Sequence, residues 1–409
     1  MKKVRSASIL LSLNFVFISL LLVSCNSTQT DTAPLLTANI REAIDKPVVL
    51  KLKDEIKAVK YVPLEVTDDD ASLVDGVYDY AVTSKYIYIL PVKEPRIVLF
   101  DRNGHFIKTL IKEGQGPGEF SGMLICIQAD EPNDRLYLYN SDRALEYTLE
   151  GDFIREYKHD YQIIYARYLK PGCLAGVAFP FQTFDGGAFG IGIFDERRDT
   201  IETKNDFYSP LVPREKSGFT ISIAATYSDL QQSVLFKTGS NDTVFRVSAD
   251  RITPACVLNL RNSDAEVIRS LDVTDFSNIK ADKKGPRDIF VQEMFDTQKY
   301  YYFRLWYNQG SYIASVDKKT GEALVEKCEM PSTIKELADA NLQHGMEGTR
   351  SFRNFPVWGR VVGNELIQVV TSYELSLYKS LSTITIPSEL NLEKEEGNPI
   401  LVFYSLHGS

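Results

Sequence analysis

The chain has 409 residues, of which 44% are hydrophobic and 25% are charged, and 55 Asp and Glu residues outnumber 46 Lys and Arg residues to give a net charge of −9. This composition is typical of a globular protein, and its acidic balance excludes a nucleic-acid binder that grips phosphates with a basic surface. It also argues against adhesion to an anionic membrane through surface charge.

The N-terminus has the pattern of a secretory signal. Lys2, Lys3 and Arg5 precede an apolar stretch at residues 9–23, which is too short for a membrane-spanning helix. The only charged residues that cleavage of such a signal removes are basic, so the mature chain has a more negative net charge than the precursor. The pattern predicts export from the cytoplasm.

The end of this signal carries a cysteine. The run Leu22-Val23-Ser24-Cys25 resembles the bacterial lipobox, in which the cysteine is linked to diacylglycerol and becomes the acylated N-terminus. The resemblance implies that residues 1–24 are a lipoprotein signal peptide and that Cys25 anchors the chain to a membrane. The alternative is an ordinary signal peptide with an incidental cysteine. Residues 25–42, which begin with a stretch rich in Thr, Ser and Asn, are expected to form a lipidated flexible tether.

Residues 43–409 contain an internal repeat, whose clearest markers are three aromatic residues. Phe100, Tyr147 and Phe194 recur at 47-residue intervals, and each ends an apolar strand before a turn. The first of these turns contains Asn103-Gly104, a strong hairpin signal because both residues tolerate positive φ. A supersecondary unit repeated at this spacing predicts the blades of a β-propeller.

The predicted strands fill six blades in chain order. They are 86–90, 96–100 and 106–110 in the first; 135–139, 144–147 and 153–157 in the second; 190–194, after a start at 173, in the third; 233–236, 242–247 and 255–260 in the fourth; 300–307 and 312–316 in the fifth; and 358–362 and 365–370 in the sixth. A lone blade exposes edges and an apolar face, so the ring of blades must close. Residues 399–404 and early strands such as 48–52 are candidates for a blade built from both chain ends.

Segments between the later blades depart from the repeat. A helical start at 263–266 and a polar stretch at 280–284 follow the fourth blade, and a capping-box match with helical periodicity at 333–345 follows the fifth. Residues 373–381 are a third candidate helix. The sequence therefore predicts an all-β fold, a six-bladed β-propeller with short helical insertions between late blades.

Four motifs carry a family resemblance, and together they span almost the whole mature chain. They are Gly114-Gln-Gly-Pro-Gly-Glu-Phe120, Tyr61-Val-Pro-Leu-Glu65, Asn241-Asp-Thr-Val-Phe-Arg-Val247 and Asn398-Pro-Ile-Leu-Val402. In these the chain resembles the six-bladed β-propeller lipoproteins of Bacteroidetes, which are similar to NHL-repeat and TolB-like propellers. The resemblance implies the fold and brings no catalytic residue with it.

Candidate chemistry in the loops is sparse. The glycine-rich loop at 114–120 lacks the Lys-Ser/Thr ending of a phosphate-binding loop, so it suits a tight crossing between blades, with Gln115 and Glu119 as its candidate ligand contacts. The acidic run at 68–70 lacks EF-hand spacing, and the four histidines never stand at metal-ligand spacing. No metal or cofactor is predicted.

The densest aromatic run lies in the fifth blade. Most of Tyr300-Tyr-Tyr-Phe303 is expected to pack between blades, whereas Arg304, Trp306 and Tyr307 are candidate ligand contacts at the rim. The remaining cysteines are widely spaced in sequence, and most are expected to be buried free thiols, with a disulfide as the alternative. They are Cys126, Cys173, Cys256 and Cys328.

These observations favour a non-catalytic, membrane-anchored propeller that binds a protein, peptide or glycan through loops at one end of its channel. One alternative is a propeller enzyme, a glycan hydrolase or lyase that uses carboxylates from distant blades. Another is a structural subunit of an outer-membrane assembly. Asn26 and the residues after it carry neither the Asp of inner-membrane retention nor an acidic surface-export run, which favours a periplasm-facing outer-membrane location.

Overall fold

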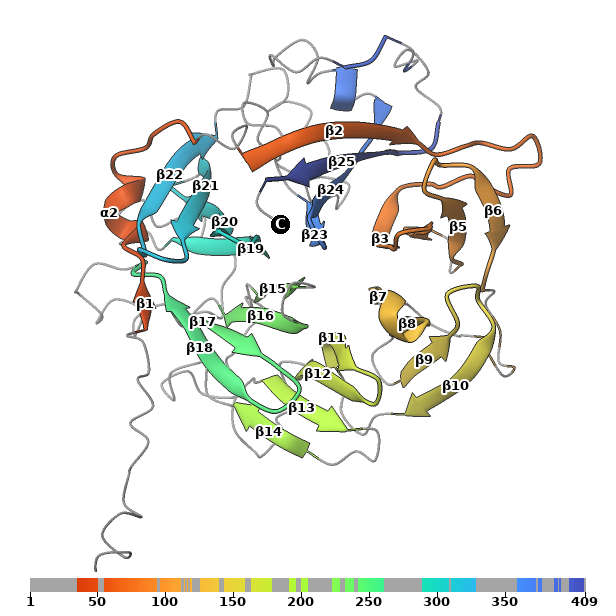
Figure 1. The fold of residues 1–409 in the computed structure, drawn as a ribbon, viewed down its shortest axis with the longest axis horizontal. Helices are drawn as coiled ribbons and strands as arrows, with labels where there is room; N and C mark the ends of the chain where they lie inside the picture. Colours follow the sequence, from red (N-terminus) through yellow and green to blue (C-terminus); the bar gives the residue numbers. More distant parts are fainter. Residues whose placement is uncertain are drawn as a thin grey trace, which may run out of the picture. The chain divides into compact units, whose positions relative to one another are not determined.

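The computed structural model describes residues 35–407 with internal gaps, the longest of which are 179–190, 205–222, 261–288 and 329–358. The elements below all belong to the unit Leu36–Ser409. Nearly all of them are strands, and they form six sheets placed as propeller blades around a common axis (Figure 1). The predicted all-β, six-bladed fold is thus confirmed. Within the described residues, no helix is long and apolar enough to cross a membrane.

The first three blades are four-stranded antiparallel meanders. Blade 1 contains β3 (Val77–Val82), β4 (Tyr86–Pro91), β5 (Val98–Asp101) and β6 (Phe106–Thr109). Blade 2 contains β7 (Cys126–Asp130), the 3-10 turn η2 (Glu131–Asn133), β8 (Arg135–Tyr139), β9 (Arg143–Tyr147) and β10 (Phe153–Lys158). Blade 3 contains β11 (Ile163–Lys170), β12 (Cys173–Ala178), β13 (Ile191–Asp195) and β14 (Thr200–Lys204).

The other three blades use both ends of the unit. Blade 4 contains β15 (Ile223–Ser228), β16 (Ser233–Thr238), β17 (Thr243–Val247), β18 (Ile252–Val257) and, parallel to β18, the short β1 (Leu36–Thr37). Blade 5 contains β19 (Phe290–Asp296), β20 (Tyr300–Tyr307), β21 (Gly310–Asp317) and β22 (Ala323–Cys328). Blade 6 contains β23 (Arg360–Val362), β24 (Glu365–Val370), β25 (Ile400–Leu406) and β2 (Ile56–Pro63).

The first strands of the blades lie innermost. Contacts join β3 to β7, β7 to β11, β15 to β19 and β19 to β23, and Figure 1 shows these strands nearest the axis. A side chain that points inward from one of them therefore faces the channel or its neighbour's inner strand.

The ring is closed in blade 6. β2 is antiparallel to β25, from Ile56 opposite Leu406 to Pro63 opposite Ile400, so the expected blade from both chain ends is confirmed. Its N-terminal strand is β2 and not the candidate at 48–52, of which residues 48–50 are described. The Val48 amide instead donates to the Val325 carbonyl in blade 5. The apolar run at 48–52 looks more like a buried strand, whereas β2 is an outermost strand with mostly exposed side chains.

The 47-residue repeat corresponds to one fixed place in the blade. Phe100, Tyr147 and Phe194 each lie in the third strand, β5, β9 or β13, and each is buried. Burial of one such side chain stabilises the fold by about 1.5–3 kcal/mol. The spacing therefore records the distance along the chain from one blade core to the next.

The turn after this position packs each blade on the blade before it. Gly104 has φ +90°, and a Cβ there would lie 2.2 Å from the carbonyl oxygen of Pro63 in the outer strand of blade 6. Gly151 has φ +92°, and a Cβ there would lie 2.6 Å from Cδ2 of Leu110, which follows the outer strand of blade 1. Only glycine combines this backbone conformation with such a close approach.

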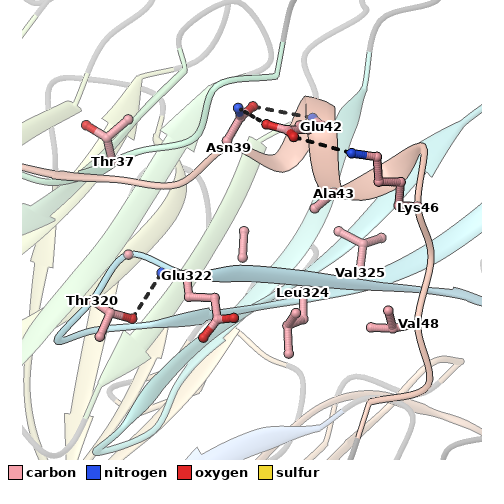
Figure 2. A pocket seen from close by; sticks show the side chains of 12 residues that line it. Thr37, Asn39, Glu42, Ala43, Lys46, Val48, Thr320, Glu322, Leu324 and Val325 are labelled. Atoms are coloured by element: carbon pink, nitrogen blue, oxygen red, sulfur yellow. Dashed lines mark hydrogen bonds and ion pairs between the residues drawn. The ribbon is translucent and has the colours of Figure 1, made fainter.

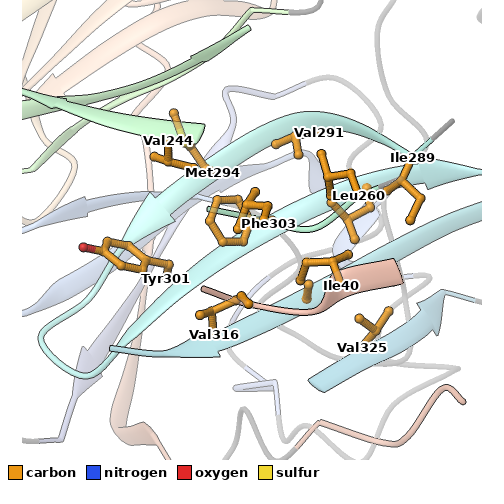
Figure 3. Close-up of a cluster of buried hydrophobic side chains, with 14 of the residues drawn as sticks. Ile40, Val244, Leu260, Ile289, Val291, Met294, Tyr301, Phe303, Val316 and Val325 are labelled. Carbon is orange, nitrogen blue, oxygen red and sulfur yellow. The ribbon is translucent and has the colours of Figure 1, made fainter. Parts of the chain in front are cut away.

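A short N-terminal segment packs across the outer edges of blades 4 and 5. In α2 (Ile40–Ile44), the Asn39 side chain caps the helix by accepting the Glu42 amide hydrogen bond at 3.3 Å. Ile40 is fully buried in the cluster that also contains Phe303 of blade 5 and Val244 of blade 4 (Figure 3). Residues 36–37 and 40–42, which fall in the stretch expected to be tether, thus belong to β1 and α2.

The remaining expectations concern insertions and cysteines. The expected helical segments at 263–284 and 333–345 lie outside the described residues, and 374–376 of the third segment are helical. The prediction of buried free thiols is confirmed for the cysteines beyond residue 35. They are Cys126, Cys173, Cys256 and Cys328.

Candidate functional site

A buried carboxylate connects the inner strands of several blades. Asp79, on β3, accepts hydrogen bonds from the amide of Tyr80 at 2.9 Å and, across to blade 2, from the amide of Ile127 at 2.9 Å. It also accepts from Nη2 of Arg360, on β23 of blade 6, at 2.5 Å. Nη2 of Arg167, on β11 of blade 3, lies 4.0 Å from its second oxygen. Four of the six blades therefore meet at one side chain.

Arg360 is held on both sides by blade 1. Besides the ion pair, its Nη1 donates to the Tyr80 carbonyl, and its guanidinium lies 4.8 Å from the centre of the Tyr80 ring. The Tyr80 hydroxyl accepts from the Arg360 amide at 3.2 Å and donates to the Ile367 carbonyl at 2.8 Å. Burial is the largest single effect and lowers the pKa of Arg360, but the charge and the hydrogen bond of Asp79, together with Tyr80, more than offset it, so the pKa of Arg360 is raised. The side chain is thus charged and fixed in position.

Blades 2 and 3 are joined by a second buried contact. The Gln128 amide on β7 donates to the Tyr168 carbonyl and accepts from the Tyr168 amide, both at 2.8 Å. The thiol of Cys126 donates to the Ala166 carbonyl at 3.4 Å, and burial raises its pKa. The Gln128 side chain thus forms the two backbone hydrogen bonds that a neighbouring strand would form with Tyr168 within a sheet. Hydrogen bonds from buried side chains therefore connect the inner strands of blades 2 and 3.

The two carboxylates of the inner strand β19, Glu293 and Asp296, form ion pairs with cations. Glu293 lies 3.3 Å from Nη1 of Arg304, its direct neighbour across β19 and β20. Asp296 has no exposed side-chain surface and pairs with Arg246 of blade 4 at 3.1 Å and with Lys318. Among the described residues, both of these carboxylates are held in ion pairs. A carboxylate held in this way is poorly suited to act as a general acid or base, which must exchange protons with the substrate.

The described residues of the glycine-rich loop form hydrogen bonds within the loop and to blade 2. Gln115 lies outside the described residues. The carboxylate of Glu119 accepts the Gly116 amide at 2.9 Å, and the Gly118 carbonyl accepts the Tyr147 hydroxyl of blade 2 at 2.9 Å. Gly118 has φ +75° and packs against Phe153. The described part of this loop is a crossing between blades 1 and 2, with an exposed carboxylate.

The three predicted rim residues of blade 5 occupy different environments. Arg304 is buried and paired with Glu293, while Trp306 and Tyr307 are partly exposed near the end of β20. The guanidinium of Arg41 lies 5.0 Å from the centre of the Tyr307 ring, which places this tyrosine beside α2. In the described part of the chain, no hydrogen bond or ion pair joins Glu119 to these residues, which belong to a distant blade.

A surface groove of about 450 Å³ lies between α2 and the edge strand β22 (Figure 2). The charged groups on its helical side are engaged with one another, because Glu42 accepts from Asn39 at 3.0 Å and lies 3.5 Å from Lys46. No predicted site residue lines it. The groove lining comprises Thr37, Asn39, Glu42, Ala43, Lys46, Val48 and residues 320–325.

Asp79 and the charged residues around it were not predicted from the sequence. Their common signal is a single charge within an otherwise apolar or aromatic strand, as in Val77-Tyr-Asp-Tyr-Ala-Val82. Arg167 has the same setting in β11. A buried charge of this kind needs a partner, and the partners here lie in other blades that are far away in the sequence, so no local pattern reveals them.

A family model described as "Domain of unknown function (DUF4934)" matches residues 35–405. The chain belongs to the DUF4934 family. The match begins one residue before β1 and ends in β25, so the DUF4934 domain covers all six blades.

Solved structures resemble this DUF4934 protein over most of its length. A Bacteroides fragilis NCTC 9343 protein named "Putative exported protein" has a TM-score of 0.60 and 17% identity, with 88% of this chain and 98% of that chain covered. A member of the DUF4221 family from Bacteroides vulgatus ATCC 8482 has a TM-score of 0.46 and 14% identity, with 86% and 96% covered. The likeness to the first shows the fold alone. No curated protein matches the chain.

Proposed function

We propose that this DUF4934 propeller is a non-catalytic binding module of the bacterial cell envelope, which holds a protein, peptide or glycan partner at one end of its channel. The observation that carries the proposal is the Asp79 cluster. Charged side chains from the inner strands of blades 1, 3 and 6 are fixed by hydrogen bonds and ion pairs, which gives a preorganised polar surface. Preorganisation lowers the ordering cost of binding a partner.

The carboxylates favour binding over glycan cleavage. A glycosidase needs two carboxyl groups on either side of the scissile bond, one of them protonated at the start of the reaction. The inner-strand carboxylates described above are paired with arginine or lysine, and an adjacent cation favours the ionised form. The geometry therefore supports recognition of a partner.

The proposed location is the outer membrane, facing the periplasm, with the acyl chains on Cys25 as the anchor. The leader at residues 1–24 supports export, and the name of the similar Bacteroides fragilis protein agrees with it. Metabolic labelling with an alkyne fatty acid tests the anchor. The wild-type protein should incorporate the label and partition into the membrane fraction, and Cys25→Ala should do neither. Equal labelling of both forms would remove the anchor from the proposal.

A capture experiment tests the binding function. The mature chain with Cys25→Ser is immobilised and exposed to envelope extract, and its partner should be retained in a saturable manner and released by excess soluble protein. Incubation of the same protein with envelope polysaccharides should release no new reducing ends. Turnover that disappears in Asp79→Asn or Glu293→Gln would support the enzyme alternative, and the absence of any saturable partner would refute the binding role.

A further inference from the structure

The outer edge of blade 5 is open for part of its length. β22 is the last strand of its sheet, and on its inner side the Glu322 carbonyl accepts from the Asp317 amide at 2.9 Å. Backbone groups alternate in direction along an antiparallel strand, so those of Ala323 and Val325 point outward. The Val325 carbonyl agrees with this direction, because it accepts from the Val48 amide at 2.8 Å. Among the described residues, no backbone hydrogen bond reaches the Ala323 amide and carbonyl or the Val325 amide.

The groove between α2 and β22 gives this edge a space for a ligand. Its volume of about 450 Å³ lies along the same residues (Figure 2) and falls within the roughly 300–1,000 Å³ of typical ligand sites. At one end is Thr37, whose carbonyl oxygen lies 2.6 Å from the position of a Cβ on Gly321, and at the other end is Val48. A strand rises about 3.4 Å per residue, so residues 321–325 accommodate an extended segment of about four residues.

The exposed side chains beside the open edge are a carboxylate and an apolar group. Glu322 and Leu324 are two residues apart and therefore lie on the same face of the sheet, which in Figure 2 is the side away from α2. Both are exposed, Leu324 by 41%. The charges of Glu42 and Lys46, which lie 3.5 Å apart, balance each other. Within the described part of the chain, no ion pair engages Glu322, so the groove lining carries one uncompensated negative charge.

Outward backbone groups at strand spacing select an extended peptide. A strand added at the edge forms hydrogen bonds with these groups, and its alternate side chains lie next to those of the edge strand. β1 is such an addition in blade 4, where it pairs with the edge strand β18. A second copy of the chain fits less well, because α2 contacts β22 where a whole blade would have to enter. The chain also has a net charge of −9, which opposes its approach to Glu322.

We propose that the outer edge of blade 5 is a second binding surface, which adds a short extended segment of a partner protein to β22. The segment carries a basic side chain that faces Glu322 and an apolar side chain, two residues away, that packs on Leu324. The inference goes beyond the proposed channel site, since β22 is an outer strand and Asp79 lies on an inner one. The order of the two side chains in the segment depends on whether it runs parallel or antiparallel to β22.

Calorimetric titration of the mature Cys25→Ser chain tests the inference. The probes are acetyl-Thr-Val-Thr-Lys-Thr-amide and acetyl-Thr-Lys-Thr-Val-Thr-amide, each compared at constant ionic strength with the same peptide carrying Glu in place of Lys. At least one Lys peptide should bind in a saturable manner, and its Glu counterpart should bind about five- to tenfold more weakly. Hydrogen exchange should slow within residues 319–328 when that peptide binds.

Two substitutions and a matched control locate the binding surface. Glu322→Gln removes the carboxylate and should weaken binding of the Lys peptide about two- to fivefold. Leu324→Ser removes the apolar contact and should weaken it about fivefold. The control Ile107→Ser changes an apolar side chain of nearly equal exposure, 42%, on the outer strand β6 of blade 1, and should bind as the wild type does. All three positions are exposed, so each variant should fold, which circular dichroism checks.

Three results would overturn the inference. They are the absence of saturable binding of both Lys peptides, wild-type affinity in the folded Glu322→Gln and Leu324→Ser variants, and slowed exchange that lies outside β22. A concentration-dependent dimer in sedimentation that Leu324→Ser abolishes would assign the edge to a second copy instead. The proposed channel function fails separately, because it is measured by the capture of an envelope partner.

Discussion

Replacement of Asp79 by Asn should destabilise the whole propeller. The substitution keeps the shape of the side chain and removes the charge that faces Arg360 at 2.5 Å and Arg167 at 4.0 Å. Removal of one partner from a buried ion pair costs about 3–5 kcal/mol, because the other charge stays behind without compensation. An Asn oxygen retains part of the hydrogen bonding, so we expect about 3 kcal/mol.

This loss corresponds to a measurable shift in the melting temperature. For a unit of roughly 370 residues, the entropy of unfolding predicts that 3 kcal/mol lowers Tm by about 4 °C. Differential scanning calorimetry and urea unfolding measure the two quantities. The matched control is Asp75→Asn, whose exposed carboxylate pairs with exposed Lys93 and should change stability by less than about 1 kcal/mol. Equal midpoints for the two variants would refute a structural role for the Asp79 cluster.

Three further predictions concern the blade interfaces. Gly104→Ala should lower the free energy of unfolding in urea by about 1–3 kcal/mol, because its Cβ would lie 2.2 Å from a carbonyl oxygen. Gly363 is also at positive φ but has no atom within 4 Å of such a Cβ, so Gly363→Ala should cost less, and the reverse order would contradict the close approach at Gly104. Ile40→Ala should lower the free energy of unfolding by about 2–5 kcal/mol, because Ile40 is buried, whereas Val49→Ala should lower it by less than about 0.5 kcal/mol, because Val49 is exposed. Equal effects would show that α2 is not part of the core. Burial raises the pKa of the Cys256 thiol to about 12, so this thiol should not react with DTNB at pH 8 until the chain unfolds, and rapid labelling of the native protein would contradict its burial. The contribution of the neutral thiol to stability is present below about pH 9 and is lost as the pH rises toward 12.

The outer parts of each blade were predictable from sequence because they repeat. Phe100 and its equivalents lie where core packing demands a large buried side chain, so the same pattern returns in each blade. The closing strand β2 was not predictable, since its exposed face removes the apolar signal that 48–52 shows. Glycine signals indicated the turns at Gly104 and Gly151, whereas α2 was not predicted, because most of its residues fall in the stretch expected to be a tether.

The candidate site was not predictable for a different reason. Asp79 and Arg360 are 281 residues apart, and their contact exists only because the ring closes. The sequence shows each of them as one charge in a short strand, without an indication of its partner. Arg304 was identified as a rim residue from its aromatic neighbours, but its side chain is buried and forms a cross-strand ion pair with Glu293. Pairing across blades and across strands is tertiary information.

A double-mutant cycle on Asp79 and Arg360 tests the central claim most directly, because it measures how strongly their ion pair couples blade 1 to blade 6. Urea unfolding is compared for the wild type, Asp79→Asn, Arg360→Gln and the double variant. The ion pair at 2.5 Å predicts a coupling free energy of about 1–3 kcal/mol, with the double variant less destabilised than the sum of the two single changes. Additive effects, within about 0.5 kcal/mol, would contradict the account.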